Sequence, residues 1–88
     1  MVQVEFRPQA GQEFEDLDEV VATGVLKNLG WLAGNFHSIK PEPLAGLFAD
    51  LFKLRVGDYR VIYQPDREKK ALIVRMLGHR REIDDRST

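Results

Sequence analysis

Apolar and polar residues alternate most regularly between residues 52 and 63, and the alternation changes phase at Gly57-Asp58. Glycine followed by aspartate suits a two-residue turn, so this segment predicts a β-hairpin in which Arg55 lies opposite Arg60. In that register one face of the hairpin is entirely apolar or aromatic, with Phe52, Leu54, Val56, Tyr59, Val61 and Tyr63. The other face carries Lys53, Arg55 and Arg60, and Ile62 is its only apolar member.

The first half of the chain predicts one strand followed by two helices. Val2, Val4 and Phe6 alternate with polar residues, which indicates a half-buried strand that ends at Pro8. Apolar residues then recur at helical spacing, with a break near Asp18-Glu19 and an end near Gly34-Asn35. These residues are Ala10, Phe14, Leu17, Val21, Val25, Leu29 and Leu32.

Polar and aromatic residues on these helices have simple predicted roles. The acidic residues of the first helix, among them Glu13, should face solvent near the positive end of the helix dipole. Trp31 is predicted to pack as part of the second helix. Prolines in residues 36–50 predict a loop there instead of a regular helix.

The last apolar segment, residues 71–77, predicts a further strand. Leu72, Val74 and Met76 are expected to face the core, which leaves Arg75 and Leu77 on the outer side. The polar segment 78–86 is predicted to leave the sheet as a tail. Residues 1–88 therefore predict a single α+β domain, in which a helical hairpin packs on a mostly antiparallel four-stranded sheet in the order β-α-α-β-β-β.

Composition excludes several kinds of site. The chain contains no cysteine, so disulfides and thiolate metal sites are excluded, and the reducing cytoplasm fits this composition. With only His37 and His79 as histidines, no metal site is predicted, and no cofactor motif is present. The sequence contains no apolar run long enough to span a membrane and no secretory signal pattern.

Charge is divided unevenly along the chain. Residues 1–50 contain three Lys or Arg and eight Asp or Glu, a net charge of −5. Residues 51–88 contain ten and six, a net charge of +4. The predicted hairpin lies in the basic half, and like charges directly opposed on a sheet repel each other. The facing pair Arg55 and Arg60 therefore indicates that this face binds an anion, such as phosphate or an acidic partner segment.

The sequence resembles the RelE/ParE superfamily of toxins from toxin–antitoxin operons, and more closely its RelE-like branch. The resemblance covers the whole chain, and its most specific parts are residues 54–63 and Gly78-His79-Arg80-Arg81-Glu82. It implies a RelE-like fold. It further implies a cytoplasmic, metal-independent endoribonuclease that cuts mRNA on the ribosome and so inhibits translation.

The resemblance also implies roles for individual residues. Lys53 falls on a lysine that acts as base or stabilises charge, and Arg60 on an arginine that binds the phosphate. Arg80 falls on an arginine that stabilises the transition state, and His79 on a position suited to acid or base catalysis. Auxiliary cations for RNA or phosphate binding are Arg55, Arg75 and Arg81.

Two departures from the family pattern leave alternatives open. Many relatives carry a tyrosine shortly after the Arg-Arg pair, whereas this chain has Asp84-Asp85 and no aromatic residue after Tyr63. A second lysine found in some relatives is Leu51 here. The alternatives are a ParE-like inhibitor of DNA gyrase and a protein that binds antitoxin but has lost toxicity.

The partners implied by the resemblance are macromolecules. A small RelB-like antitoxin would wrap an acidic or amphipathic segment over the basic face and neutralise the toxin. The ribosome and its mRNA would be the targets. Operator DNA would be reached only through the complex with the antitoxin.

Overall fold

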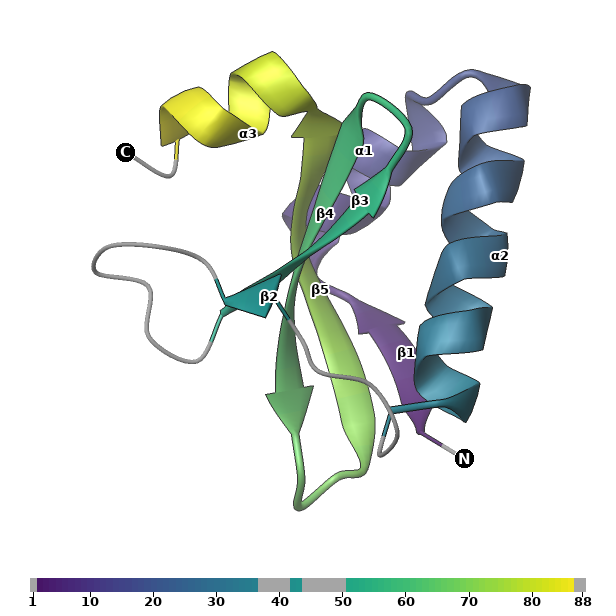
Figure 1. The fold of residues 1–88 in the computed structure, drawn as a ribbon, viewed down its shortest axis with the longest axis vertical. Helices are drawn as coiled ribbons and strands as arrows, with labels where there is room; N and C mark the ends of the chain where they lie inside the picture. The colour runs from purple at the N-terminus through teal and green to yellow at the C-terminus, as the bar shows by residue number, and fades with distance from the viewer. Residues whose placement is uncertain (1, 37–41, 44–50, 87–88) are drawn as a thin grey trace.

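The computed structural model describes residues 2–36, 42–43 and 51–86, with the side chains of all of these except 42–43 and 84–86. Within these residues, two helices, α1 (Pro8–Glu15) and α2 (Glu19–Gly34), cover one face of a five-stranded sheet (Figure 1). The strand order is β1-β5-β4-β3-β2, with β1 parallel to β5 and every other pair antiparallel. The strands are Gln3–Phe6 (β1), Glu42–Pro43 (β2), Phe52–Val56 (β3), Tyr59–Asp66 (β4) and Ala71–His79 (β5).

This architecture confirms the predicted α+β fold, and the predicted strand, two helices and three strands follow in the expected order. Two elements were not predicted. The short strand β2 adds an edge to the sheet, where Pro43 is tolerated because an edge strand need not donate every N–H. The helix α3 (Arg80–Arg86) occupies most of the segment 78–86 that was predicted to leave the sheet as a tail, and β5 extends through the first two residues of that segment. The rest of the predicted loop, residues 37–41 and 44–50, lies outside the described residues.

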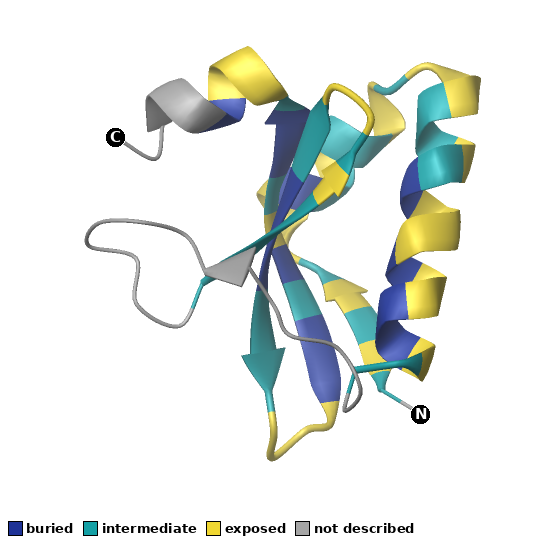
Figure 2. Ribbon diagram, in the orientation of Figure 1, coloured by how far each residue is buried: buried dark blue, intermediate teal, exposed yellow. Residues whose placement is uncertain are grey.

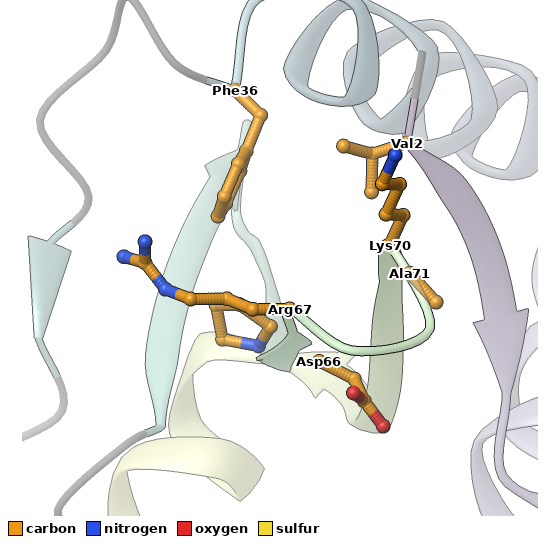
Figure 3. A pocket seen from close by; sticks show the side chains of 7 residues that line it. Val2, Phe36, Asp66, Arg67, Lys70 and Ala71 are labelled. Carbon is orange, nitrogen blue, oxygen red and sulfur yellow. The ribbon is translucent and has the colours of Figure 1, made fainter.

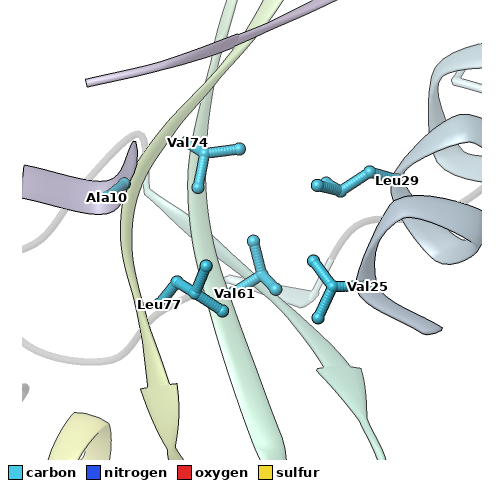
Figure 4. Close-up of a cluster of buried hydrophobic side chains, with 6 residues drawn as sticks. All are labelled: Ala10, Val25, Leu29, Val61, Val74 and Leu77. Atoms are coloured by element: carbon cyan, nitrogen blue, oxygen red, sulfur yellow. The ribbon is translucent and has the colours of Figure 1, made fainter. Parts of the chain in front are cut away.

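The main core lies between the two helices and the sheet, where the buried side of α2 faces β4 and β5 (Figure 2). At its centre Val25 and Leu29 of α2 point towards Val61 and Val74 of the sheet (Figure 4). A second cluster continues this core with Leu32, Ala33, Tyr63 and Leu72. The apolar face predicted for the hairpin is therefore confirmed as the face that packs on the helices.

The helix α2 begins and ends as predicted, and at its end the N–H of Asn35 donates to the carbonyl of Trp31 over 3.0 Å. The prediction that Trp31 is a packing residue of this helix is wrong, because the residue is 57% exposed. Leu29 and Leu32 occupy the inward stripe of the helix, and the spacing of Trp31 from them turns it outwards. In the described ranges, no helix is both long enough and apolar enough to cross a membrane.

A bulge in β5 reverses the predicted direction of two side chains. Ile62 of β4 pairs with Met76, but the next residue of β4 pairs with Val74, so Arg75 is an extra residue on β5. The alternation of β5 changes phase at this point. Leu77 consequently joins the main core, and Met76 packs on the opposite face. The predicted inward Met76 and outward Leu77 are both wrong for this reason.

The face of the sheet opposite α1 and α2 carries a smaller apolar cluster. Ile83 of α3 and Ile62 of β4 are both fully buried there, with Leu51 and Met76 packed against them. This contact holds α3 against the sheet on the side away from α2 (Figure 1). It also explains why Ile62 is the one apolar residue among the cations of the hairpin.

Tyr63 gives the fold a pH dependence that can be measured. Burial raises the pKa of its hydroxyl above the ordinary value of 10.0. Above that pH the unfolded chain therefore loses a proton that the folded chain keeps, and stability is expected to fall by up to about 1.4 kcal/mol per pH unit. Urea unfolding at several pH values between 8 and 11 would measure the fall. Tyr63→Phe should show a shallower decline, and an equally steep one would contradict this assignment.

Candidate functional site

The hairpin has the predicted turn and the predicted register. Gly57 adopts a positive φ of 58°, and Arg55 lies directly opposite Arg60. Lys53 lies two residues before Arg55, and thus about 7 Å away on the same face. We call this side of the sheet, which carries Lys53, Arg55, Arg60 and Arg75, the cationic face. It is the face opposite α1 and α2.

Arg60 lies on the cationic face near the hairpin turn, in an unusual environment. Its side chain is half-buried, and its Nε is fully buried with no hydrogen-bond partner in the part of the chain that the structure describes. One terminal nitrogen reaches only the carbonyl of Tyr59, at a long 3.5 Å. Gly78, the residue paired with Arg60 on β5, has no side chain to supply an acceptor. A buried N–H without an acceptor typically costs about 1–3 kcal/mol, so the environment of Arg60 is unfavourable as it stands.

Two further predicted cations follow β5 at the start of α3. The backbone N–H of Arg80 donates to the carbonyl of Asp58 over 2.7 Å, which joins the start of α3 to the hairpin turn. The side chains of Arg80 and Arg81 are exposed. Since Arg60 follows Asp58 by two residues, the structure brings Arg80 to the same end of the sheet as Arg60.

Arg75 lies on the cationic face but away from this end. Its guanidinium donates to the side-chain oxygen of Gln64 over 3.2 Å. Gln64 is four residues from Arg60 along β4, a separation of about 13 Å in an extended strand. The structure therefore separates Arg75 from the cations near the hairpin turn, Arg55, Arg60 and Arg80, which we call the cluster around Arg60.

His79 lies on the other face of the sheet. It pairs with Tyr59, and the two rings meet edge to face with centroids 5.6 Å apart. Its Nδ1 accepts a hydrogen bond from the N–H of Arg81 over 3.3 Å, so the neutral ring carries its proton on Nε2. The sheet thus separates His79 from Lys53 and Arg60, although all three were predicted to act together.

The surroundings of His79 contain residues to which the sequence assigned no role in the site. A pocket at the end of β5 is lined by His79 and by three acidic side chains, which are Glu13 of α1, Asp16 directly after α1, and Glu82 of α3. Glu13 is half-buried and accepts a hydrogen bond from the N–H of Leu77. The prediction that Glu13 faces solvent is therefore wrong. The available signal was its spacing of three residues from the core residue Ala10.

A different pocket, of about 280 Å³, lies at the opposite end of the sheet beside the turn between β4 and β5. Figure 3 shows Val2 and Phe36 on its walls, together with the stems of Arg67 and Lys70. The pocket is mostly apolar, and none of the predicted site residues lines it. It is therefore separate from the cluster around Arg60.

The cluster around Arg60 is suited to binding and stabilising a phosphate. Guanidinium groups present several N–H donors in a fixed plane, which matches phosphate oxygens, and Lys53 adds a point charge nearby. Among the described residues, no group of three or more His, Asp or Glu side chains could hold a metal ion. The described side chains supply charge and hydrogen bonds for phosphate chemistry.

Comparison with known proteins identifies the family. Residues 4–83 match the family described as ParE toxin of type II toxin–antitoxin system, parDE. A search of the curated proteins finds no match.

Solved structures show the same fold. The isolated RelE toxin of E. coli is 20% identical, with a TM-score of 0.77 and full coverage of both chains. A chain of the RelBE2 toxin–antitoxin complex of Mycobacterium tuberculosis is 24% identical with a TM-score of 0.77, covering 89% of this chain and 96% of that one. A chain of the intact E. coli RelBE complex is 24% identical with a TM-score of 0.71, covering 90% and 96%. The predicted RelE-like fold is confirmed.

Proposed function

Because the chain belongs to the family of ParE toxins of type II toxin–antitoxin systems, we propose that this toxin is a metal-independent endoribonuclease that cleaves mRNA on the ribosome. The observation that carries the proposal is Arg60, which lies directly opposite Arg55 and whose buried Nε has no acceptor among the described residues. The terminal nitrogens of Arg60 would donate to an RNA phosphate, whose negative charge would lie beside this pair of guanidinium groups.

The reaction class is attack of the RNA on its own backbone. The 2′-oxygen forms a bond to phosphorus while the bond from phosphorus to the 5′-oxygen breaks, which leaves a cyclic phosphate and a 5′-hydroxyl. A base takes the proton of the 2′-hydroxyl and an acid donates one to the 5′-oxygen. Negative charge grows on the phosphate oxygens in the transition state, and preorganised cations lower the barrier by stabilising it.

The residues of the cationic face fit this charge-stabilising work. We assign phosphate binding to Arg60 and transition-state stabilisation to Arg80, with Lys53 as base or as a further charge. Arg55 and Arg81 would contact the RNA backbone close by, and Arg75 would do so further along the sheet. A role for His79 as acid or base stays a prediction, and it is supported by the position of His79 directly before Arg80.

The partner proposed for this chain is a RelB-like antitoxin. Several of the structurally similar chains come from toxin–antitoxin complexes. An acidic segment of such an antitoxin would neutralise the cationic face and block access of RNA to Arg60. The site of action would be the cytoplasm, where the ribosomes are, and operator DNA would be bound through the antitoxin.

A second candidate is inhibition of DNA gyrase. The observation that favours it is the family match itself, because the matched family is described by the ParE toxin. An inhibitor of DNA gyrase cleaves no RNA, so Arg60 and Arg80 would then have no catalytic role.

Induction of this protein alone in a bacterial host tests the proposal. Mapping of mRNA ends is expected to show cuts within translated messages and none in the same messages with the start codon removed. Arrest of growth with intact mRNA, together with inhibited supercoiling by purified gyrase, would replace the proposal with the second candidate. Absence of both cleavage and arrest would identify a protein that has lost toxicity.

A further inference from the structure

The strand β5 extends beyond the strand that supports one of its edges. β1 ends at Phe6, which pairs with Val74, and the last hydrogen bond between the two segments runs from the N–H of Arg7 to the carbonyl of Val74 over 2.9 Å. β5 continues to His79. On its other edge, β4 remains paired with it as far as His79. The last part of β5 therefore has a strand on only one side.

A side chain of α1 takes the place of the missing strand. The N–H of Leu77 donates to Oε1 of Glu13 over 3.0 Å, across 64 positions of sequence. Successive N–H groups of a strand point to opposite edges, so this N–H points away from β4 and towards the side where β1 has ended. A carboxylate accepts such a bond more strongly than a carbonyl does, because the acceptor is charged.

The position of Glu13 is set by the packing of α1 against β5. Ala10, one helical turn earlier, is fully buried in the same cluster as Leu77 (Figure 4), so α1 lies directly on β5 at this point. The acids that follow Glu13 are placed differently. Glu15 of the same helix and Asp16, directly after the helix, are both exposed, and Asp16 accepts a hydrogen bond from the side chain of Gln12.

His79 and Arg80, two of the predicted site residues, lie two and three positions after Leu77. The N–H of Arg80 also donates to the carbonyl of Asp58 in the hairpin turn over 2.7 Å. We infer that Glu13 is a positioning residue for this end of β5: its carboxylate replaces β1 at the free edge and so fixes the direction in which Arg80 leaves the sheet. The expected effect of Glu13 on mRNA cleavage rests on the proposed function. The effect of Glu13 on the end of β5 rests on its contact with Leu77 alone.

Three variants of the full chain test the inference. Glu13→Ala removes the acceptor, and Glu13→Gln removes the charge but keeps an oxygen that can accept from Leu77. Glu15→Ala is the matched control, because it removes the same charge from an exposed position of the same helix. Amide hydrogen exchange of Leu77 and of the core residue Val61 is followed in each variant. Single-turnover mRNA cleavage on programmed ribosomes gives the maximal rate and the half-saturating toxin concentration.

The expected result separates positioning from general destabilisation. In Glu13→Ala the Leu77 amide should exchange at least about tenfold faster relative to Val61. The maximal cleavage rate should fall about 10- to 100-fold, because a displacement of about 1 Å at a reacting group has an effect of this size. The half-saturating concentration should stay unchanged. Glu13→Gln should restore most of the slow exchange of the Leu77 amide and most of the maximal cleavage rate. Glu15→Ala should match the wild type in both.

Other results overturn the inference. Equal acceleration of Leu77 and Val61, or a cleavage rate of Glu13→Ala within twofold of the wild type, would reduce Glu13 to an ordinary packing residue. Equal losses of cleavage rate in Glu13→Ala and Glu13→Gln would mean that the charge of Glu13 causes the effect and that its hydrogen bond to Leu77 does not. If the wild type does not cleave mRNA, the proposed function fails. Amide exchange at Leu77 then tests the structural inference by itself. An amide exchange rate of Leu77 that is the same in Glu13→Ala as in the wild type overturns the inference.

Discussion

Replacement of Arg60 by alanine is expected to lower the rate of mRNA cleavage on programmed ribosomes by about 10²- to 10³-fold, the usual effect of removing one preorganised donor from a developing oxyanion. Arg60 lies on the cationic face near the hairpin turn, and its buried Nε has no acceptor among the described residues. Single-turnover cleavage measures the loss. Arg60→Lys keeps the charge but not the planar pair of donors, and it should recover only part of the rate.

The matched control for this variant is Arg67→Ala, which removes an exposed arginine from the turn between β4 and β5 at the other end of the sheet. It should cleave at the wild-type rate. The stability of Arg60→Ala should equal or exceed that of the wild type, because the change removes a buried N–H without an acceptor and one of two opposed charges. A cleavage rate within threefold of the wild type would contradict the role proposed for Arg60.

Ile83→Ala is expected to lower the free energy of unfolding by about 2–4 kcal/mol. Ile83 is fully buried, and with Ile62 it forms the cluster that fixes α3 on the sheet. Urea unfolding followed by far-ultraviolet circular dichroism measures the loss. Because α3 begins with Arg80, cleavage should also fall in the folded variant.

Leu26→Ala is the control for this change, since Leu26 is an aliphatic helix residue that is 52% exposed. The loss there should stay below about 0.5 kcal/mol. Similar small losses in the two variants would mean that α3 is not held by Ile83 and that the end of β5 positions Arg80 without it.

Most of the fold could be predicted because its signals are local. In the hairpin, strict alternation on both sides of Gly57-Asp58 permits only one register that gathers the apolar residues on one face, and this register is the one observed. The cationic pair Arg55 and Arg60 follows directly from it. The two helices were equally readable, because their apolar residues recur at helical spacing and their ends are marked by Pro8 and by Gly34-Asn35.

The prediction of the candidate site was less complete, because the residues after the bulge depend on contacts between distant segments. The spacing of Arg80 and Arg81 from the strand was visible, but α3 was not, since its seven residues depend on the packing of Ile83 against Ile62. His79 was grouped with Arg60 by chemistry alone. The structure separates them, because a strand places Tyr59 and Arg60 on opposite faces and His79 pairs with Tyr59.

The sequence by itself determined the α+β architecture, the register of the hairpin and the cations that line it, because period and turn chemistry are properties of neighbouring residues. Only the tertiary structure decided the bulge at Arg75, which sends Leu77 to the core and Met76 to the other face. It alone brought Glu13 to the free edge of β5. Both outcomes depend on which strand ends first and on which helix packs beside it. Both are set by contacts between segments far apart in the chain, so no local sequence pattern predicts them.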